Sequence, residues 1–508
     1  MLGRANGAVL HGVDAYLVEV EVDLGAGLPT ISAVGRPDAA VREGIDRIRS
    51  ALRYGGFKLP DGRITVNLAP AERRKQGTSL DLPIAVALLL ASEQIGRMKT
   101  SGMVFAGELA LDGVLRPVRG VLSLAMAARK AGCETLLVPA ANADEAGLVR
   151  GLEVVSLETL ADVKAFAAGP RAVRAAVDPG ALLLKGAAAL PGRDLEDVRG
   201  QASARRALEI AAAGGHHLLL SGPPGAGKTM LASRLPGILP PLTLEEALEV
   251  TRIWSAAGLC QGLVARRPFR APHHAISFAG LTGGGPRLRP GEISLASHGV
   301  LYLDEFTEFR RDALEALRQP LEDGAITVVR VHGAATFPAA FTLVASMNPC
   351  PCGHHGNPQG RCRCTPMQIQ RYRGRLSGPL LDRFDLVIEV PPLDLESLAR
   401  SRPAESSAVV RRRVVQARER QRSRFGRQGP TCNARMGAAH LKRFAQLDQE
   451  GRHLLTVACE KLGLSARGFD RVRRVALTLA DLEQRERVTA ADVAEALQYR
   501  RPDQIGRD

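Results

Sequence analysis

One short segment combines glycines, a lysine and a threonine in the order that binds nucleotide phosphates. His217–Leu231 reads HLLLSGPPGAGKTML, in which an apolar run precedes a G-x-x-x-x-G-K-[ST] pattern and a helical run follows. The glycines let main-chain N–H groups surround phosphates, Lys228 supplies a cation to the β and γ oxygens, and Thr229 offers a hydroxyl to Mg²⁺. The predicted ATP contacts are Gly222, Pro223, Pro224, Gly225, Ala226, Gly227, Lys228 and Thr229.

Further polar residues lie at the ends of apolar runs that predict strands. In GVLYLDEF (299–306), Asp304 suits the Mg²⁺ shell, and Glu305 suits orienting and polarising an attacking water. FTLVASMNP (341–349) contains Asn348, whose amide is placed to sense a γ-phosphate or its water. GPLLDRFDLVIEV puts Arg383 just before another strand. A surface acidic pair is the alternative for Asp304 and Glu305, and the complete phosphate loop disfavours it.

The segment NPCPCGHHGNPQGRCRCTP (348–366) holds four of the eight cysteines as two C-x-C pairs. Four thiolates in a reduced compartment suit a tetrahedral Zn²⁺, and His354 or His355 could replace one of them. The alternative is a surface loop with free thiols. The predicted zinc ligands are Cys350, Cys352, Cys362 and Cys364.

This cysteine-rich segment lies between two predicted site residues, Asn348 and Arg383. A closed Cys₄ site has no open position for catalysis. We therefore expect the metal to stiffen an insert, or to present Arg361 and Arg363 to DNA or to a neighbouring subunit.

The bulk composition favours a polyanionic partner. The chain has 508 residues, with 68 Lys and Arg against 53 Asp and Glu, which gives a formal charge of +15. Such a surplus attracts nucleic acid through Coulomb forces and counterion release, although an Arg-rich genome would also raise the charge. No apolar run reaches the roughly 20 residues that span a bilayer, and the N-terminus does not read as a signal peptide. A cytoplasmic protein without a membrane partner is predicted.

The pattern along the chain predicts an α/β fold followed by helices. Residues 1–170 alternate strand-like runs, such as 64–70 and 134–140, with helical runs such as AAVREGIDRIRSALRYGG. An Ala-, Gly- and Pro-rich stretch at 171–194 predicts a linker. Residues 195–392 form the phosphate-loop module, and residues 393–508 are predicted to form a helical, Arg-rich lid.

The phosphate-loop module resembles the AAA+ ATPases, with Walker A at 222–229, Walker B at 301–305 and Asn348 as sensor 1. LLDRFD resembles the arginine-finger motif of the helix-2-insert group, which implies that Arg383 reaches the γ-phosphate bound by a neighbouring subunit. LSARGFDRVRRVALTLADL resembles the sensor 2 helix, with Arg467 in the sensor position and Arg471 and Arg474 as alternatives. An arginine that acts on a neighbour implies a ring, most often a hexamer.

Longer phrases are similar to one subgroup of these ATPases. RPFRAPHH, PGEISLASHGVLYLDE, FPAAFTLVASMNPCPCG and SGPLLDRFD look like the magnesium-chelatase-like ComM/YifB family, and the similarity runs from residue 1 to about 500. That family is linked to natural transformation. The resemblance implies a hexameric, ATP-driven DNA motor that promotes branch migration while incoming DNA is integrated.

Two inserts of the module carry basic residues. One fills 267–299 between Walker A and Walker B, and the other is a predicted hairpin at 324–341. In the ring motors that this chain resembles, such inserts line the central pore and grip the polymer, although they could instead hold subunit interfaces. The candidate contacts to single-stranded or branched DNA are Arg287, Arg289, Arg330 and His332. His273 and His274 are expected to be hydrogen-bonded loop residues.

The N-terminal region resembles the Lon protease catalytic domain, a ribosomal-protein-S5-like α/β fold. Ser79 falls at the position of that family's nucleophile, but Leu122 and Leu124 stand where the segment would carry the basic lysine, and Lys75 does not occupy the matching position. A serine without a base is a poor nucleophile. We therefore expect no proteolysis, a turn or helix-capping role for Ser79, and a scaffold or DNA-binding collar for the domain.

The C-terminal region contains VVRRRVVQARERQRSRFGR (409–427), whose arginines could follow DNA phosphates or pack against protein. Thr489 is expected to cap the last helix, with Asp492 at N3. The resulting prediction is an ATP-driven DNA motor. The alternatives are a chelatase-type motor subunit, an ATP-dependent protease, which the missing lysine disfavours, and a non-enzymatic scaffold, which the complete ATPase motifs disfavour.

Overall fold

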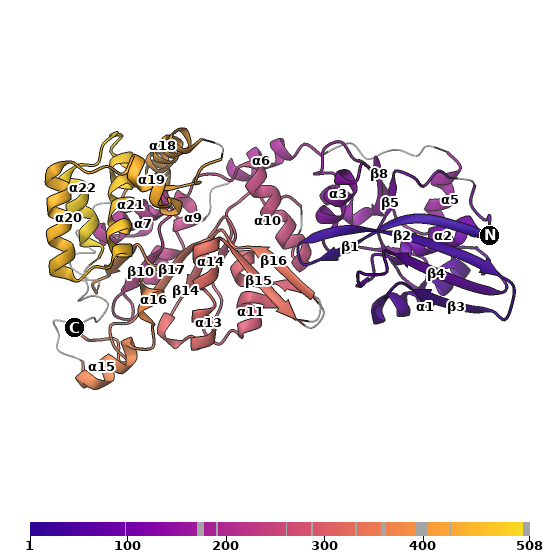
Figure 1. The fold of residues 1–508 in the computed structure, drawn as a ribbon, viewed down its shortest axis with the longest axis horizontal. Coiled ribbons are helices and arrows are strands. Elements are labelled where there is room, and N and C mark those ends of the chain that lie inside the picture. Colours follow the sequence, from indigo (N-terminus) through magenta and orange to yellow (C-terminus); the bar gives the residue numbers. More distant parts are fainter. Residues whose placement is uncertain are drawn as a thin grey trace.

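The computed structural model describes residues 1–96, 98–169, 177–188, 192–260, 262–285, 288–330, 333–356, 362–392, 404–426 and 428–500. Figure 1 shows an elongated molecule with a twisted sheet at the N-terminal end, a second sheet in the middle and a helical bundle at the other end. Helix α10 and the β15–β16 hairpin lie on the side of the middle part that faces the N-terminal sheet.

The N-terminal sheet has seven strands in the order β3-β4-β2-β1-β5-β8-β9. β1 pairs antiparallel with β2 and β2 with β4, whereas the outer pairs are parallel. The predicted strands at 64–70 and 134–140 are confirmed as β4 and β8. The strands are β1 Leu2–His11, β2 Asp14–Gly25, β3 Thr30–Val34, β4 Arg63–Ala69, β5 Met103–Phe105, β8 Thr135–Pro139 and β9 Glu153–Leu157, with a small β6 Glu108–Leu109 and β7 Leu115–Arg116 pair beside them.

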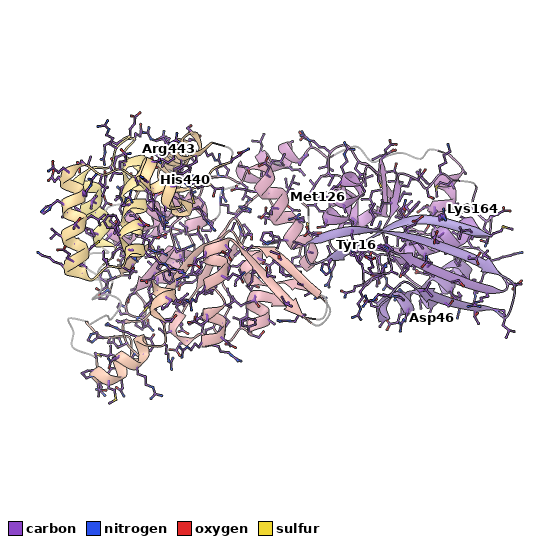
Figure 2. All side chains as sticks on the ribbon, viewed as in Figure 1. Tyr16, Asp46, Met126, Lys164, His440 and Arg443 are labelled. Atoms are coloured by element: carbon purple, nitrogen blue, oxygen red, sulfur yellow. The ribbon has the colours of Figure 1, made fainter. Side chains whose placement is uncertain are left out.

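Helices of this part follow their sequence patterns. α2 (Asp81–Ala91), DLPIAVALLLA, is apolar on nearly every side and almost completely buried, as expected for a helix enclosed in a core. α1 is amphipathic and ends at Gly55, which confirms the predicted stop. Tyr16 of β2, labelled in Figure 2, donates its hydroxyl hydrogen to the main-chain oxygen of Arg74 at 2.8 Å. The other helices are α1 Ala39–Tyr54, α3 Val121–Lys130, α4 Ala143–Ala146 and α5 Ala161–Ala167.

The middle part is a five-stranded parallel sheet in the order β11-β14-β17-β10-β18. Leu218 of β10 pairs with Val344 of β17, and Leu303 of β14 pairs with Ala345 of the same strand. The carboxyl ends of parallel strands meet at one edge of a sheet, so the residues that follow these three strands are brought together. The strands are β10 Leu218–Ser221, β11 Phe269–Arg270, β14 Val300–Leu303, β17 Thr342–Met347 and β18 Leu386–Glu389.

Helices and inserts surround this sheet. The predicted hairpin at 324–341 is confirmed as β15 (Ala325–Arg330) and β16 (Gly333–Pro338). A second small hairpin in the 267–299 insert pairs β12 (Gly283–Gly284) with β13 (Arg289–Pro290). The helices are α7 Ala202–Gly214, α8 Lys228–Ala232, α9 Leu235–Ile238, α10 Leu244–Ala257, α11 Phe278–Thr282, α12 Glu292–Leu295, α13 Arg311–Glu315, α14 Arg318–Asp323, α15 Pro366–Arg373 and α16 Gly378–Leu381.

The C-terminal lid is helical, and its core continues into the middle part. Val414 of α18 and Val475 of α21 belong to the same apolar cluster as Leu208 of α7 and Leu386 of β18. The lid is therefore fixed to the sheet by shared burial of apolar side chains. Its helices are α18 Ser407–Phe425, α19 Ala438–Phe444, α20 Gln449–Leu462, α21 Ala466–Leu482 and α22 Ala490–Gln498. Thr489 caps α22 in a capping box with Asp492, as predicted.

The predicted linker at 171–194 contains a helix, α6 (Pro179–Ala188), that sequence reasoning did not predict. Its run of Ala and Leu has good helix propensity, which outweighs the flanking Gly and Pro. Residues 170–176 and 189–191 lie outside the described residues. Among the described residues, no helix is both long enough and apolar enough to cross a membrane.

The N-terminal part contacts the middle part through α10. The N–H of Gly120 donates to the main-chain oxygen of Ser255 at 3.2 Å, and the Ser255 hydroxyl donates to the Glu145 carboxylate. Arg252 also pairs with Asp14 at 3.4 Å. The Nε2 atom of His11, at the end of β1, lies 3.0 Å from the main-chain oxygen of Ala334 in β16. The β15–β16 hairpin is thus held against the N-terminal sheet.

Candidate functional site: a nucleotide-phosphate site

The phosphate loop connects β10 to α8. Gly227 has φ +85°, a left-handed conformation that favours glycine, and it precedes Lys228 at the first position of α8. Lys228 Nζ donates to the main-chain oxygens of Gly222 and Pro223 at 2.6 and 2.9 Å, and to Asn348 Oδ1 at 3.2 Å. The structure therefore brings the predicted sensor, at the end of β17, beside the predicted phosphate-binding lysine.

The predicted Mg²⁺ ligands also meet at this edge. Thr229 Oγ1 donates to Asp304 Oδ2 at 2.9 Å, and the Ser346 hydroxyl donates to Asp304 Oδ1. The Tyr302 hydroxyl bonds Thr229 Oγ1 at 3.1 Å and Ser346 Oγ at 3.0 Å. Hydroxyl and carboxylate oxygens are the ligands that Mg²⁺ prefers. The donor set at Thr229 and Asp304 fits this ion.

Burial and hydrogen bonding in the site shift two pKa values. Burial raises the pKa of Asp304, but hydrogen bonds from Ser346 and Thr229 outweigh burial and hold this pKa below its ordinary value. Burial lowers the pKa of Lys228, and the charges of Asp304 and Glu305 oppose that effect. A bound polyphosphate would act in the same direction as these carboxylates and favour the charged lysine.

Glu305 follows Asp304 and adopts a left-handed backbone with φ +52°. Its carboxylate oxygen Oε2 lies 3.2 Å from Nδ1 of His274, which comes from the insert that follows β11. Sequence reasoning placed His274 in a hydrogen-bonded loop and missed this contact. The neighbouring His273 does serve the loop, because its Nδ1 accepts the N–H of Ala275 at 3.2 Å. No local sequence signal links His274 to a carboxylate thirty-one positions later.

The two predicted arginines of the finger and of sensor 2 lie together. Arg383 and Arg467 line one cavity of about 290 Å³ between the sheet and the lid, and none of the residues lining it belongs to the phosphate loop. Arg383 is buried; it donates to the main-chain oxygen of Pro379 at 2.8 Å and pairs with the Glu322 carboxylate. Burial lowers the pKa of Arg383, Glu322 opposes this, and Arg467 adds to it.

Buried polar bonds fix the walls of this cavity. Asp385 binds Arg471 at 2.8 Å and His216 Nδ1 at 3.1 Å. Burial alone would raise the pKa of Asp385, but the charge of Arg471 and the bond to His216 hold it far below its ordinary value. His216 Nε2 also lies 2.8 Å from the Thr478 hydroxyl of α21. The helix that carries Arg467 is thereby attached to the strand that follows Arg383.

Two of the four candidate DNA contacts are described. Arg330 ends β15, and its guanidinium lies over Gly284, because a Cβ at Gly284 would be 3.1 Å from one of its nitrogens. Arg289 belongs to β13, whose partner strand β12 contains Gly284. The two arginines thus lie on neighbouring hairpins of the two inserts. Arg287 and His332 lie outside the described residues.

The arginines of α18 mostly have partners within the chain. Arg413 pairs with Glu209 at 2.6 Å and with Glu405 at 2.8 Å. Arg424 pairs with the buried Asp481, and Arg418 donates to the main-chain oxygen of Ala212 at 3.1 Å. For Arg413, Arg418 and Arg424, these contacts favour packing against protein over a path for DNA.

Ser79, which stands at the position of the Lon family's nucleophile, has a structural partner. Ser79 lies in a turn and donates to the main-chain oxygen of Ala8 at 2.8 Å. The helix-capping alternative is wrong, because Leu80 is the N-cap of α2 and no side chain caps that helix. Lys75 instead donates to the main-chain oxygen of Pro70, and Leu122 and Leu124 are buried in the core. Ser79 and Lys75 therefore have different partners.

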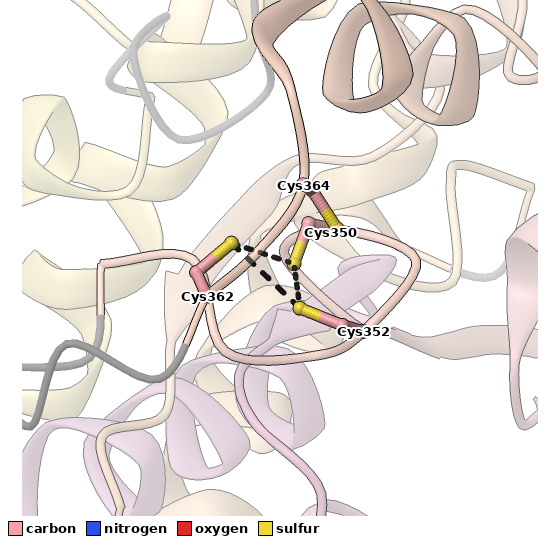
Figure 3. A group of neighbouring side chains, drawn as sticks. All are labelled: Cys350, Cys352, Cys362 and Cys364. Carbon is pink, nitrogen blue, oxygen red and sulfur yellow. Dashed lines mark hydrogen bonds between the residues drawn. The ribbon is translucent and has the colours of Figure 1, made fainter.

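The cysteines of the 348–366 segment form a group that could hold a metal ion. Their four sulfur atoms all lie within 4.8 Å of one another. The four side chains are drawn in Figure 3. Among the described residues, neither His354 nor His355 belongs to the group. Arg361 lies outside the described residues, and Arg363 is exposed.

Comparisons with known proteins identify the relatives of this chain. The family model described as "Magnesium chelatase, subunit ChlI" matches residues 194–398, "Subunit ChlI of Mg-chelatase" matches 20–142, and "Magnesium chelatase, subunit ChlI C-terminal" matches 404–500. "Competence protein ComM" of Haemophilus influenzae is 46% identical over 498 residues, which cover 96% of this chain and 95% of that protein. The chain belongs to the magnesium-chelatase-like ComM/YifB family.

A second full-length relative agrees with this assignment, and a further similarity is confined to about a third of the chain. "Uncharacterized protein YifB" of Escherichia coli (strain K12) is also 46% identical over 498 residues, covering 97% of this chain and 96% of that protein. "Lon protease 2" of Bacillus subtilis is 25% identical over 181 residues, covering 32% of each chain. Membership of the ComM/YifB family, together with the AAA+ fold of the middle part, supports ATPase activity with ATP and Mg²⁺.

Proposed function

We propose that this protein is an ATP-driven motor that moves DNA strands and promotes branch migration while homologous DNA is integrated during natural transformation. The observation that carries the proposal is the convergence of the phosphate loop, the Asp304–Glu305 pair and Asn348 at one edge of a parallel sheet. The similarity to a competence protein along nearly the whole chain supports the DNA-related part.

ATP hydrolysis would use positioning and charge neutralisation. Lys228 would bind the β- and γ-phosphates, and Asn348, which contacts Lys228, would position the γ-phosphate or the water. Mg²⁺ would be held by Thr229 and Asp304 and would neutralise phosphate charge. Glu305 would accept a proton from the attacking water, a role that requires an unprotonated carboxylate.

The cavity between the sheet and the lid supports a composite site between subunits. Arg383 and Arg467 share this cavity, and Lys228 does not line it. Two arginines that face the same space favour one shared anion, and the γ-phosphate held by a neighbouring subunit supplies that charge. A closed ring, most often a hexamer, lets every subunit receive such a pair. Glu322, the present partner of Arg383, would have to release it.

The inserts support a role in gripping DNA. Arg289 and Arg330 lie on adjacent hairpins, and a guanidinium binds phosphate oxygens in any base sequence. The hairpin with Arg330 also contacts the end of β1 through Ala334 and His11. The N-terminal part, which we propose to be a non-proteolytic Lon-like fold, would act as a scaffold or collar for these hairpins. We place the protein in the cytoplasm.

A chelatase-type motor subunit is the second candidate, because all three matching family models carry the description of a magnesium chelatase subunit. One experiment separates the two functions. The purified full-length protein is given ATP and a labelled Holliday junction, beside Lys228→Ala, and ATP hydrolysis is measured with and without DNA. We expect DNA-stimulated hydrolysis and strand movement that Lys228→Ala abolishes. ATP hydrolysis that DNA does not stimulate, without strand movement, would refute the motor.

A further inference from the structure

The four clustered cysteines have the geometry of a tetrahedral metal site. The Sγ atom of Cys350 lies 3.3 Å from that of Cys352 and 3.8 Å from that of Cys362, and the last two are 3.7 Å apart. Zn–S bonds of about 2.3 Å put the sulfur atoms of a tetrahedral Zn²⁺ site about 3.8 Å apart. A disulfide would need about 2.05 Å. The arrangement therefore suits one shared ion and no disulfide.

The first C-x-C pair, Cys350 and Cys352, closely follows Asn348 of the nucleotide-phosphate site along the chain. It starts two positions after Asn348, and Cys350 is completely buried. The N–H of Gly353 donates to the main-chain oxygen of Cys350 at 2.9 Å, and the N–H of His355 donates to Cys350 Sγ at 3.3 Å. These bonds fold the chain into a tight turn around one sulfur atom, the cysteine turn (residues 350–355).

The cysteine turn touches the phosphate loop. Gly353 is buried with φ +81°, and a Cβ on it would lie 2.6 Å from Cδ of Pro224 and 3.8 Å from Cγ of Asn348. A side chain at Gly353 cannot be accommodated without moving Pro224 or the turn, because Cβ contacts below 3.0 Å are essentially never seen. The turn is thus a wall against which both the phosphate loop and the predicted sensor pack.

The second C-x-C pair leads to the other side of the site. Cys364 is followed by Thr365, which caps α15 in a capping box. Near the end of α15, the Tyr372 hydroxyl accepts a hydrogen bond from Thr307 at 2.6 Å. Thr307 lies two positions after Glu305 in the chain. Arg373 returns to the first pair, because its Nε donates to the main-chain oxygen of Pro349 at 3.3 Å. A metal ion held by all four cysteines would join these two segments.

We propose that Cys350, Cys352, Cys362 and Cys364 bind one Zn²⁺ and that this centre sets the position of the phosphate loop through the contact between Gly353 and Pro224. Zinc is then required for tight ATP binding, although it takes no part in the chemistry. The inference depends on nucleotide binding at the phosphate loop. It holds whether or not the protein moves DNA, because its readouts are metal content and ATP affinity.

The metal is tested on the full-length protein. Zinc and iron are measured in the purified wild type, in Cys362→Ser/Cys364→Ser and in the control Cys260→Ser/Cys459→Ser, whose two cysteines are half-buried and lie outside the cluster. We expect about one zinc per chain in the wild type and in the control, and at least a fivefold loss in the cluster variant. Wild-type protein that contains iron in place of zinc, or neither metal, overturns the site.

The contact is tested with two glycine variants of the same loop. Gly353→Ala and Gly356→Ala impose the same left-handed strain, since Gly356 has φ +76°, but a Cβ at Gly356 would meet nothing within 4 Å. ATP affinity is measured with a fluorescent ATP analogue. We expect Gly353→Ala to retain zinc and bind at least tenfold more weakly than wild type, whereas Gly356→Ala binds like wild type.

A second measurement does not depend on any substitution. Wild-type protein is treated with 1,10-phenanthroline, which chelates zinc, or with its non-chelating 1,7 isomer, and ATP affinity is measured again before and after zinc is restored. We expect at least a tenfold loss with the chelator alone and recovery with zinc. Unchanged ATP affinity in both the metal-free protein and Gly353→Ala overturns the coupling, even if the DNA assay succeeds.

Discussion

His298 lies in a charged cluster two positions before β14, the strand that leads to Asp304. Its Nε2 lies 3.1 Å from Glu249 and its Nδ1 lies 3.6 Å from Glu246, both on α10. Arg267, which is half-buried beside Glu246, donates to the main-chain oxygen of His298 at 2.6 Å. Burial lowers the pKa of His298, but the two glutamates outweigh burial and raise it to about 9. His298 is therefore charged in the folded protein at neutral pH.

The raised pKa predicts a stability that depends on pH. A pKa near 9 in the folded state, against an ordinary value near 6.5, corresponds to about 3 kcal/mol in favour of the charged folded form. We expect about 2 kcal/mol, because Glu249 is partly exposed and solvent screens its charge. Since the folded-state pKa is raised, this contribution is complete below pH 6.5 and is lost as the pH rises through about 9.

The test compares His298→Asn with wild type. Asparagine is neutral and tolerates the left-handed backbone at this position, where φ is +56°. Trp254, the single tryptophan, lies on α10 and donates to the main-chain oxygen of Leu295 at 3.1 Å, so its fluorescence reports local unfolding. Urea unfolding is followed at pH 6 and at pH 9.5. His453→Asn, an exposed change on α20, is the control.

We expect His298→Asn to lower the free energy of unfolding by about 2 kcal/mol at pH 6 and to have little effect at pH 9.5, because the wild-type imidazole is then neutral. The control is expected to follow wild type at both pH values. A difference that stays constant between pH 6 and pH 9.5, or that grows with pH, would refute the assigned charge of His298.

Three further predictions concern nucleotide turnover. Lys228→Ala should weaken binding of ATP at least tenfold but leave AMP binding unchanged, because the lysine serves the β- and γ-phosphates; equal losses in a nucleotide titration would contradict its role. His274→Ala should raise the ATPase rate without DNA about two- to fivefold. The reason is that the partly exposed contact of His274 with Oε2 of Glu305, of about 0.5–1 kcal/mol, is removed. A slower rate would show that His274 instead supports Glu305 as the base. Arg383→Ala should lower the ATPase rate of the assembled protein about a hundredfold or more, but it should leave the ATP affinity of dilute subunits unchanged. A loss of ATP affinity in dilute subunits would place Arg383 in the nucleotide site of its own subunit.

Much of the nucleotide site could be predicted from local patterns. An apolar run followed by GPPGAGKT fixes a strand, a loop and a helix start, and the same reasoning locates Asp304 and Asn348 after their strands. Parallel pairing then brings these strand ends together, so that Lys228 and Asn348 meet although 120 positions separate them. The sequence pattern places each of these residues after a strand, and the order and direction of the strands then determine that the residues meet.

Partner choice in the rest of the site depends on packing that no local pattern encodes. Arg383 pairs with Glu322, and His274 contacts Glu305, because α14 and the insert after β11 happen to lie beside these residues in the folded chain. Charge counting likewise left two interpretations of the α18 arginines open. They could follow DNA phosphates or pack against protein, and the structure favours packing for Arg413 and Arg424, which pair with buried carboxylates.

The cysteine turn shows where the two kinds of information meet. The C-x-C spacing predicts that four sulfur atoms can converge, since short chelating spacings hold their thiolates close together. It does not predict that Gly353 lies against Pro224, because that contact depends on the direction in which the chain leaves β17. The insert between Asn348 and Arg383 therefore forms part of the wall of the nucleotide site. A change confined to this insert can thus alter nucleotide affinity without touching any residue of the phosphate loop.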